Sequence, residues 1–236
     1  MRVHFLGSGD AFGSGGRNQS AYLLEDEPHL YLIDCGSSTL PAFRRSGLDP
    51  GDLDAVILSH LHGDHFAGLP FFFIHYLYDK PRTRPLVVAG PLGTEERVRS
   101  LMTLMYGEKE LPFVVFAALE PDIATPVAGA NVLGFQVPHQ NDAVSLGLRV
   151  KVAGRTVLFS GDSSWTDQFI TQSRGADMFI CECCYYDVRS TSHMNYLEIE
   201  ASRERLECKR LILTHMGEEM LARRRSLPVS TAEDGL

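Results

Sequence analysis

The segment 59–68, SHLHGDHFAG, constrains the fold more than any other part of the chain. It places three histidines and an aspartate within six positions, directly after the apolar run AVIL at 55–58. A run that is apolar at every position is typical of a strand buried on both faces, as in α/β proteins. A solvent-exposed polar loop has no reason to follow such a strand with this density of donors. The segment therefore predicts a metal site at the end of a buried strand.

The donors of this segment do not fit easily around a single ion. His60 and His62 are two positions apart, so they project to the same side if the extended conformation continues. Gly63 then allows a sharp turn, and Asp64 and His65 point from the start of the next helix. The spacing predicts two ions, each lacking further ligands. Imidazole and carboxylate donors favour Zn²⁺, with Mn²⁺ and Fe²⁺ as alternatives.

Three further candidate ligands also follow apolar runs. His139 comes after FQVP, Asp162 after VLFSG, and His215 after LILT. Taken singly, each would be interpreted as a hydrogen-bonded structural histidine or an Asx-turn aspartate. Because all three stand where a strand is expected to end, we expect them to converge with the first segment at one edge of a sheet.

The whole chain, 1–236, predicts a single layered α/β domain with a substantial core. Apolar and β-branched runs bounded by turn residues predict strands at 3–6, 21–24, 30–33, 55–58, 86–89, 113–116, 130–137, 144–152, 156–159, 178–181 and 211–213. Helical periodicity is found at 37–46, 67–78, 94–106, 165–173 and 195–207. Thr94 is the expected N-cap of the third helix. The tail, about 222–236, is expected to be disordered or to start a last strand.

An internal similarity divides the chain into two halves. YLIDCGSS (31–38) resembles VLFSGDSS (157–164), and AVILSH (55–60) resembles RLILTH (210–215). Two such halves could form two packed sheets whose strand ends meet at one edge. Chance similarity between apolar strands is the alternative explanation.

Composition narrows the classes of function. The net charge of −8 argues against a broad nucleic-acid-binding surface. No apolar run approaches the roughly 20 residues that a membrane helix needs, and the first residues lack a signal-peptide core. Five cysteines, three of them in CECC (181–184), favour reduced thiols in the cytoplasm, and a packing role for that cluster.

These motifs together resemble the metallo-β-lactamase superfamily, in the branch that contains ribonuclease Z and related phosphodiesterases. The His-x-His-x-Asp-His motif stands at 60–65, and the opening FLGSGDAFGSGGRNQSAYLL (5–24) looks like the first strand–loop–strand of that branch. LIDCG (32–36), GPLGTEE (90–96), SGDSS (160–164) and LILTHMG (211–217) follow in family order. The resemblance covers nearly the whole chain, and it implies an αββα sandwich of two mixed β-sheets flanked by helices.

The resemblance also implies two sets of metal ligands joined by one carboxylate. The first ion would be held by His60, His62 and His139, and the second by Asp64, His65 and His215. Asp162 would bridge them, at a position where the β-lactamases themselves usually carry cysteine. Two such ions lower the pKa of a shared water and stabilise charge on a phosphodiester.

A histidine for proton transfer is implied by STSHMNYLEI (190–199), which looks like the ribonuclease Z segment with that role. We therefore predict His193 as the general acid, and as the catalytic residue beside Asp64, itself a predicted ligand. The alternative is a surface histidine that flanks a helix. Glu182 stands where the family often has a glutamate near the site, so it is expected to orient a ligand histidine.

One departure from the family bears on substrate. In ribonuclease Z a long arm that grips tRNA is commonly inserted between the counterparts of His139 and Asp162. Here residues 140–161 are the entire connection, and two predicted strands with a VAGR turn (152–155) consume it. We predict a dinuclear metal-dependent phosphodiesterase for small phosphodiesters or cyclic nucleotides, with a homodimer allowed because dimers are common in this branch. The weaker alternatives are tRNA 3′-end cleavage, and thioester or lactone hydrolysis on the same metal pair.

Overall fold

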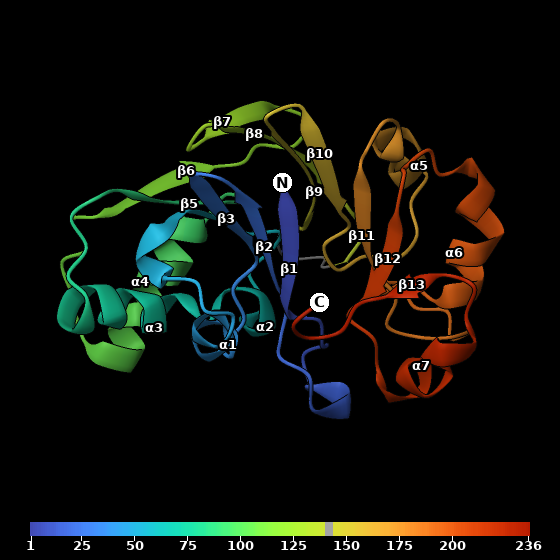
Figure 1. Cartoon of the computed structure of the whole chain (residues 1–236), viewed down its shortest axis with the longest axis horizontal. Helices are drawn as coiled ribbons and strands as arrows, with labels where there is room; N and C mark the ends of the chain where they lie inside the picture. Colours follow the sequence, from blue (N-terminus) through green and yellow to red (C-terminus); the bar gives the residue numbers. More distant parts are fainter. Residues whose placement is uncertain (140–143) are drawn as a thin grey trace.

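Two mixed β-sheets form the centre of the molecule, and helices cover the outer face of each (Figure 1). The computed structural model describes residues 1–139 and 144–236. The first sheet contains, in spatial order, β1 (Arg2–Gly7), β2 (Ala21–Asp26), β3 (His29–Ile33), β4 (Leu53–Ile57), β5 (Leu86–Gly90) and β6 (Val114–Ala118). Its first three strands are antiparallel, and β3 to β6 are parallel.

The second sheet repeats this plan in reverse spatial order. It contains β13 (Ser230–Thr231), β12 (Leu211–Thr214), β11 (Met178–Glu182), β10 (Arg155–Phe159), β9 (Leu146–Val152), β8 (Ala130–Gln136) and β7 (Ala124–Val127). The strands from β13 to β10 are parallel, and those from β10 to β7 are antiparallel. Each half of the chain therefore supplies one sheet with a parallel and an antiparallel part.

Helices pack on the two outer faces. The outer face of the first sheet is covered by α1 (Thr39–Arg45), α3 (Leu69–Ile74), the π-turn His75–Asp79 and α4 (Thr94–Tyr106). The short helix α2 (Gly63–Phe66) lies at the end of β4. The outer face of the second sheet is covered by α5 (Gln168–Ser173), α6 (Tyr196–Ser202) and α7 (Glu218–Arg223). Short 3₁₀ turns occupy Ser14–Gly16, Pro50–Asp52, Arg203–Arg205 and Arg224–Ser226.

Alternation along the strands produces three apolar layers. In β2, Leu23 faces the helices of the first half, whereas Tyr22 and Leu24 face the second sheet. The central layer joins the inner faces of both sheets, and Phe159 of β10 packs against Tyr22 with ring centroids 5.0 Å apart. The outer layer of the second half contains Phe169 of α5. The αββα sandwich expected from the sequence is confirmed.

Local details differ from the sequence prediction. Thr94 is not an N-cap: Gly93 precedes the helix with φ of 89°, and the Thr94 hydroxyl donates to the Pro91 carbonyl at 2.6 Å. The helix expected at 67–78 is α3 followed by the π-turn. The structure adds strand β7, which includes Pro126, and the tail contains the short strand β13, in line with one of the two expectations for it.

The connection between His139 and Asp162 consists, from residue 144 on, of the hairpin β9–β10 and the residues that flank it. The prediction for 140–143 lies outside the described residues. Among the helices in the described ranges, none combines the length and apolar character needed to cross a bilayer.

Candidate metal centre

The predicted site residues meet where strands of both sheets end. His60 and His62 follow β4, with Asp64 and His65 on the short helix α2 behind them. His139 follows β8, Asp162 follows β10, and His215 directly follows β12. The structure brings all seven predicted ligands together at this edge, in two groups whose donor atoms lie within 4.8 Å of one another.

The first group contains three imidazoles. Nδ1 of His62 lies 3.2 Å from Nε2 of His60 and 3.0 Å from Nε2 of His139. The His139 ring is fixed from behind, because its Nδ1–H donates to the Ser192 carbonyl at 2.7 Å. This bond leaves the Nε2 lone pair of His139 free toward the other two rings. Burial and the charge of His65 hold the pKa of His60 well below its usual range, which favours the neutral, ligating form.

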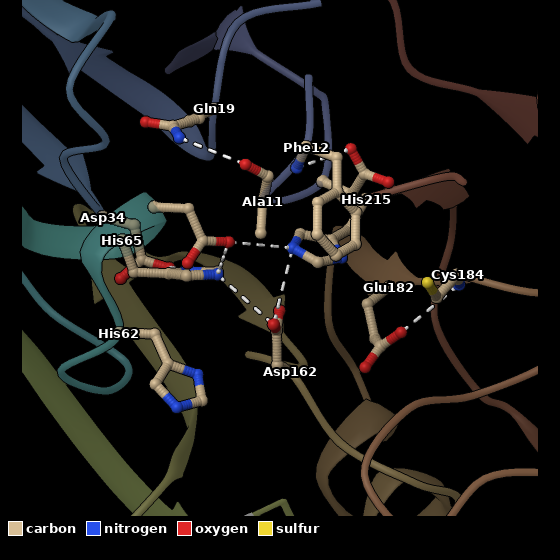
Figure 2. Close-up of polar contacts among 12 residues, drawn as sticks. Ala11, Phe12, Gln19, Asp34, His62, His65, Asp162, Glu182, Cys184 and His215 are labelled. Atoms are coloured by element: carbon tan, nitrogen blue, oxygen red, sulfur yellow. Dashed lines mark hydrogen bonds and ion pairs between the residues drawn. The ribbon is translucent and has the colours of Figure 1, made fainter. Parts of the chain in front are cut away.

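The second group contains two carboxylates and two imidazoles. Oδ2 of Asp162 lies 3.3 Å from Nε2 of His65 and 3.4 Å from Nε2 of His215. Oδ2 of Asp64 lies 3.1 and 3.4 Å from the same two nitrogens. Figure 2 shows these contacts as dashed lines. The same Asp162 oxygen is 3.9 Å from Nε2 of His60, so it faces both groups.

Unpartnered buried atoms test whether these donors fit metal ions. Nε2 of His65 and Oδ1 of Asp162 have no hydrogen-bond partner among residues 1–139 and 144–236. A buried polar atom without a partner costs free energy, and a coordinated cation would satisfy such an atom. Imidazole and carboxylate donors at these separations fit two divalent ions of the zinc type. These seven residues could hold them, and His193 and Cys184 offer further donor atoms within 4.8 Å of members of the two groups.

The charges of the second group balance internally. Burial alone would lower the pKa of His65, but Asp162, Asp34 and Asp64 together raise it well above its usual value. Burial also opposes a charged Asp162, and the charges of His215 and His65 nevertheless hold the pKa of its carboxyl well below the usual range. The carboxylates are therefore ionised, as metal ligation requires.

Asp34 was missed as a site residue by the sequence reasoning. It is fully buried after β3, and its Oδ2 accepts the His65 Nδ1–H at 2.7 Å. Its Oδ1 accepts the Ser59 backbone N–H at 2.8 Å, which ties the end of β4 to that of β3. The signal was present in LIDCG and in its similarity to the SGDSS segment that contains Asp162. A strand-end aspartate within hydrogen-bond reach of a histidine commonly fixes that histidine as a ligand.

His193 lies beside the second group rather than on the distant surface. Its ring stacks on that of His215, with centroids 5.8 Å apart and 13° between the planes. Its Nδ1 is 3.1 Å from Oε1 of Glu182 and 4.0 Å from Oδ2 of Asp162. Burial lowers the pKa of His193, but the hydrogen bond and charge of Glu182, with the charge of Asp162, outweigh it and raise the pKa. His193 can therefore carry a proton at the edge of the cluster.

Glu182 is fully buried at the end of β11 and holds several groups at once. Its Oε1 also accepts the Ser163 N–H at 2.6 Å, and its Oε2 accepts the backbone N–H groups of Cys184 and Met194, each at 3.3 Å. Glu182 thus orients His193, and within the described ranges none of the ligand imidazoles donates a hydrogen bond to it. The expectation that it orients a ligand histidine is wrong in this detail.

The remaining histidines lie outside the two ligand groups, and of the cysteine cluster Cys184 places its sulfur within 4.8 Å of donor atoms of His193 and His215. His4 pairs with Glu25 at 2.8 Å, and His75 pairs with Asp79 at 2.9 Å, both away from this edge. Cys181 is buried in the outer apolar layer, and burial raises the pKa of its thiol. Gly63 starts α2 without a positive φ, so the turn at this position does not require glycine.

Comparisons with known proteins agree with this geometry. Residues 1–229 match the protein family described as anti-Pycsar protein Apyc1. Ribonuclease Z of Methanosarcina acetivorans is 26% identical over 267 aligned positions, which cover 92% of this chain and 87% of the relative. The probable metallo-hydrolase YhfI of Bacillus subtilis is 29% identical over 225 residues, with the same two coverages.

Solved structures are similar over the whole chain. The crystal structure of YhfI, a metallo-β-lactamase-fold protein, has a TM-score of 0.82 and 25% identity, covering 99% of this chain and 97% of that one. The short form of human tRNase Z has a TM-score of 0.81 and 27% identity, covering 100% and 98%.

Proposed function

Because the chain belongs to the anti-Pycsar protein Apyc1 family, within the ribonuclease Z-like branch of the metallo-β-lactamase superfamily, we propose that it is a dinuclear metal-dependent phosphodiesterase. Its substrates are small phosphodiesters or cyclic nucleotides. The observation that carries this proposal is the position of His193, a proton donor held by Glu182 against the ligand cluster.

Two groups of residues would hold the ions. The first consists of His60, His62 and His139, the second of Asp64, His65 and His215, with Asp162 between them. Two divalent ions bound there would lower the pKa of a shared water and neutralise charge on the phosphate. Zn²⁺ is the favoured ion for this donor set, and Mn²⁺ and Fe²⁺ are the alternatives.

His193 supplies the proton that the leaving group requires. An alkoxide is a poor leaving group, and protonation as the P–O bond breaks lowers the barrier. The raised pKa of His193 keeps a proton available, and Glu182 holds Nδ1 so that Nε2 is the remaining donor atom. An ester or lactone with a better leaving group needs this proton less, so the residue favours diester hydrolysis over the thioester or lactone alternative.

The short segment between His139 and Asp162 supports a small substrate over tRNA. The hairpin β9–β10 fills most of the span between His139 and Asp162. The alignment with the archaeal ribonuclease Z extends over 267 positions, more than the 236 residues of this chain, so that relative contains insertions absent here. The net charge of −8 also disfavours a polyanion with many phosphate contacts. A tRNA 3′-end endonuclease nevertheless remains the second candidate, because the relatives named ribonuclease Z match most of the chain.

A substrate panel tests the proposed function. The purified protein, loaded with Zn²⁺ or Mn²⁺, would be assayed on 2′,3′- and 3′,5′-cyclic nucleotides, a linear diester, precursor tRNA and a lactone. We expect about two bound ions per chain and the highest kcat/KM on a small diester. Absence of stoichiometric metal, together with inactivity after metal addition, would overturn the hydrolase proposal. A preference for precursor tRNA would replace it with the endonuclease.

The role of His193 has its own test. His193→Ala should lower kcat on diesters with alkyl leaving groups by about 10²-fold or more, and should affect nitrophenyl diesters much less. His29→Ala is the matched control, because His29 is exposed and pairs with Asp54 near the start of β4, far from the cluster. Equal losses on both substrate classes would remove the proton-donor role from His193.

A further inference from the structure

Phe12 has a fractional exposure of 91%, the largest among the big apolar side chains of the described residues. It belongs to the loop between β1 and β2, which contributes no metal ligand or proton donor. A single exposed apolar residue is ordinary on a protein surface. Its position and the rigidity of its loop distinguish this one.

The loop is held in one conformation by a buried carboxylate. Asp10 is 3% exposed, and its oxygens accept the backbone N–H of Phe12 at 3.2 Å, the N–H of Ser14 at 2.9 Å and the Ser14 hydroxyl at 2.7 Å. Gln19 Nε2 donates to the carbonyl of Ala11 at 3.4 Å. The ring of Phe12 is therefore presented to solvent from a fixed backbone, which reduces the entropy that a ligand would have to remove.

The same loop borders the second ligand group. The N–H of His215 donates to the Ser8 carbonyl at 3.1 Å, and Gly9 forms a bridge with Met216. On the far side of the loop, the N–H of Gly15 donates to Glu218 of α7 at 2.9 Å. Figure 2 draws Ala11 and Phe12 of this loop together with His215 and the other residues of the cluster.

A second aromatic residue lies on the same side. Tyr185, half-buried after β11, has its ring centroid 6.3 Å from that of His193 at an interplanar angle of 83°. Its backbone N–H donates to the Met194 carbonyl at 3.3 Å, so the ring is fixed beside the predicted proton donor. The His193 and His215 rings stack on each other, so Tyr185 stands next to one continuous pair of imidazoles. The loop of Phe12 approaches the same pair through the backbone bond between Ser8 and His215.

We propose that Phe12, with Tyr185, forms an aromatic platform that stacks on the nucleobase of a nucleotide diester. The inference rests on the proposed function, because a leaving oxygen that takes its proton from His193 must lie on this side of the cluster. The sugar that bears that oxygen also carries the base, which is thereby directed toward the two rings. Every nucleobase has a flat aromatic face, so such a platform selects for a base without selecting its identity.

The test compares a base-bearing substrate with a base-free one. Wild-type protein and Phe12→Ala would be assayed on a 3′,5′-cyclic nucleotide and on the abasic 3′,5′-cyclic ribose phosphate. We expect Phe12→Ala to lower the ratio of the two kcat/KM values about tenfold, through KM for the nucleotide. Phe12→Tyr should keep the wild-type ratio. Leu104→Ala on α4 is the control, because Leu104 is 84% exposed on another part of the surface.

Binding is measured separately from turnover with Phe12→Trp. A slowly hydrolysed cyclic nucleotide phosphorothioate should change the fluorescence of the added indole beyond the change that the wild-type protein shows, and its abasic counterpart should not. The platform is overturned if both cyclic phosphates are hydrolysed but Phe12→Ala leaves their ratio as in the wild type. If the wild-type protein hydrolyses neither, the proposed function fails, and a missing fluorescence response to the phosphorothioate then overturns the platform as well.

Discussion

Nδ1 of His65 lies 2.7 Å from Oδ2 of Asp34, and both side chains are completely buried. The bond joins the end of β3 to the short helix α2, and it turns Nε2 of His65 toward Asp64 and Asp162. An imidazole held in this way has a fixed tautomer and a fixed ring orientation. Asp34 thus positions a candidate ligand without approaching the metal site itself.

Replacement of Asp34 should therefore weaken metal binding. Asp34→Asn keeps the size of the side chain but removes its negative charge, so it orients His65 less firmly. We expect the apparent affinity for the ion of the second group to fall about 10- to 100-fold, measured by competition with a chromophoric chelator. Asp52→Asn, which changes an exposed carboxylate on the turn before β4, should bind metal like the wild type. Wild-type affinity in Asp34→Asn would contradict the positioning role.

Two glycines, Gly63 at the start of α2 and Gly68 just after its end, should respond differently to replacement by alanine. A Cβ at Gly68 would lie 2.2 Å from the carbonyl oxygen of Gly36 and 2.8 Å from that of Cys35, so backbone would have to move. Gly68→Ala should lower the free energy of unfolding by about 1–3 kcal/mol or more. A Cβ at Gly63 would meet nothing within 4 Å, so Gly63→Ala should leave stability unchanged or raise it by up to about 1 kcal/mol. Urea unfolding measures both, and equal losses would contradict the packing at Gly68.

Asp177 should make stability depend on pH in acid. Its carboxylate accepts hydrogen bonds from Lys209 Nζ and from the Thr156 N–H, each at 2.8 Å. The hydrogen bonds from Lys209 and the Thr156 N–H hold the pKa of Asp177 below its usual range. A carboxyl whose pKa is lower in the folded than in the unfolded state stabilises the folded protein. This contribution is complete at pH values above the ordinary pKa of about 4, and it is lost as the pH falls through the pKa of the folded state.

The measurement is a set of urea unfolding curves from pH 7 to pH 3. Asp177→Asn should be less stable than the wild type at pH 7, and the difference should shrink below about pH 4. Asp187→Asn serves as control, because Asp187 is exposed and has no side-chain hydrogen bond or ion pair within the described ranges. A difference that stays constant across the pH range would rule out the ionic origin.

The parts of the fold that the sequence predicts are those dominated by burial. AVIL (55–58) and LIL (211–213) are apolar throughout because each strand is covered on both faces, and a donor after such a strand must lie at the sheet edge. β7 was missed because Pro126 cannot donate to a ladder, and only an edge position such as this one tolerates it. β13 has two residues, too few for any periodicity, so the sequence left a last strand and disorder as alternatives for the tail.

Prediction of the site from the sequence has a similar limit. A ligand and the group that orients it can have the same residue type and the same place after a strand, as Asp162 and Asp34 do. What separates them is which atom faces the cluster: Oδ2 of Asp162 does, whereas Asp34 contacts His65 at the nitrogen that points away from the cluster, Nδ1. That difference arises from the packing of two sheets against each other, which no local pattern encodes. The partner of Glu182 is likewise decided by the path of the segment from 185 to 193.

Glu182 and His193 should behave as one unit in catalysis. Oε1 of Glu182 faces the N–H groups of Ser163 and His193, and Oε2 faces those of Cys184 and Met194. In Glu182→Gln, the side-chain amide must point its own NH₂ at N–H donors in either orientation. We expect a loss of about 1–3 kcal/mol in the free energy of unfolding and a fall in kcat on alkyl-leaving diesters that approaches that of His193→Ala. The double variant should be little worse in kcat than His193→Ala alone, because the carboxylate acts on the leaving group only through that imidazole. Effects that multiply in the double variant would show instead that Glu182 reaches catalysis by another route, such as its bond to the residue after Asp162.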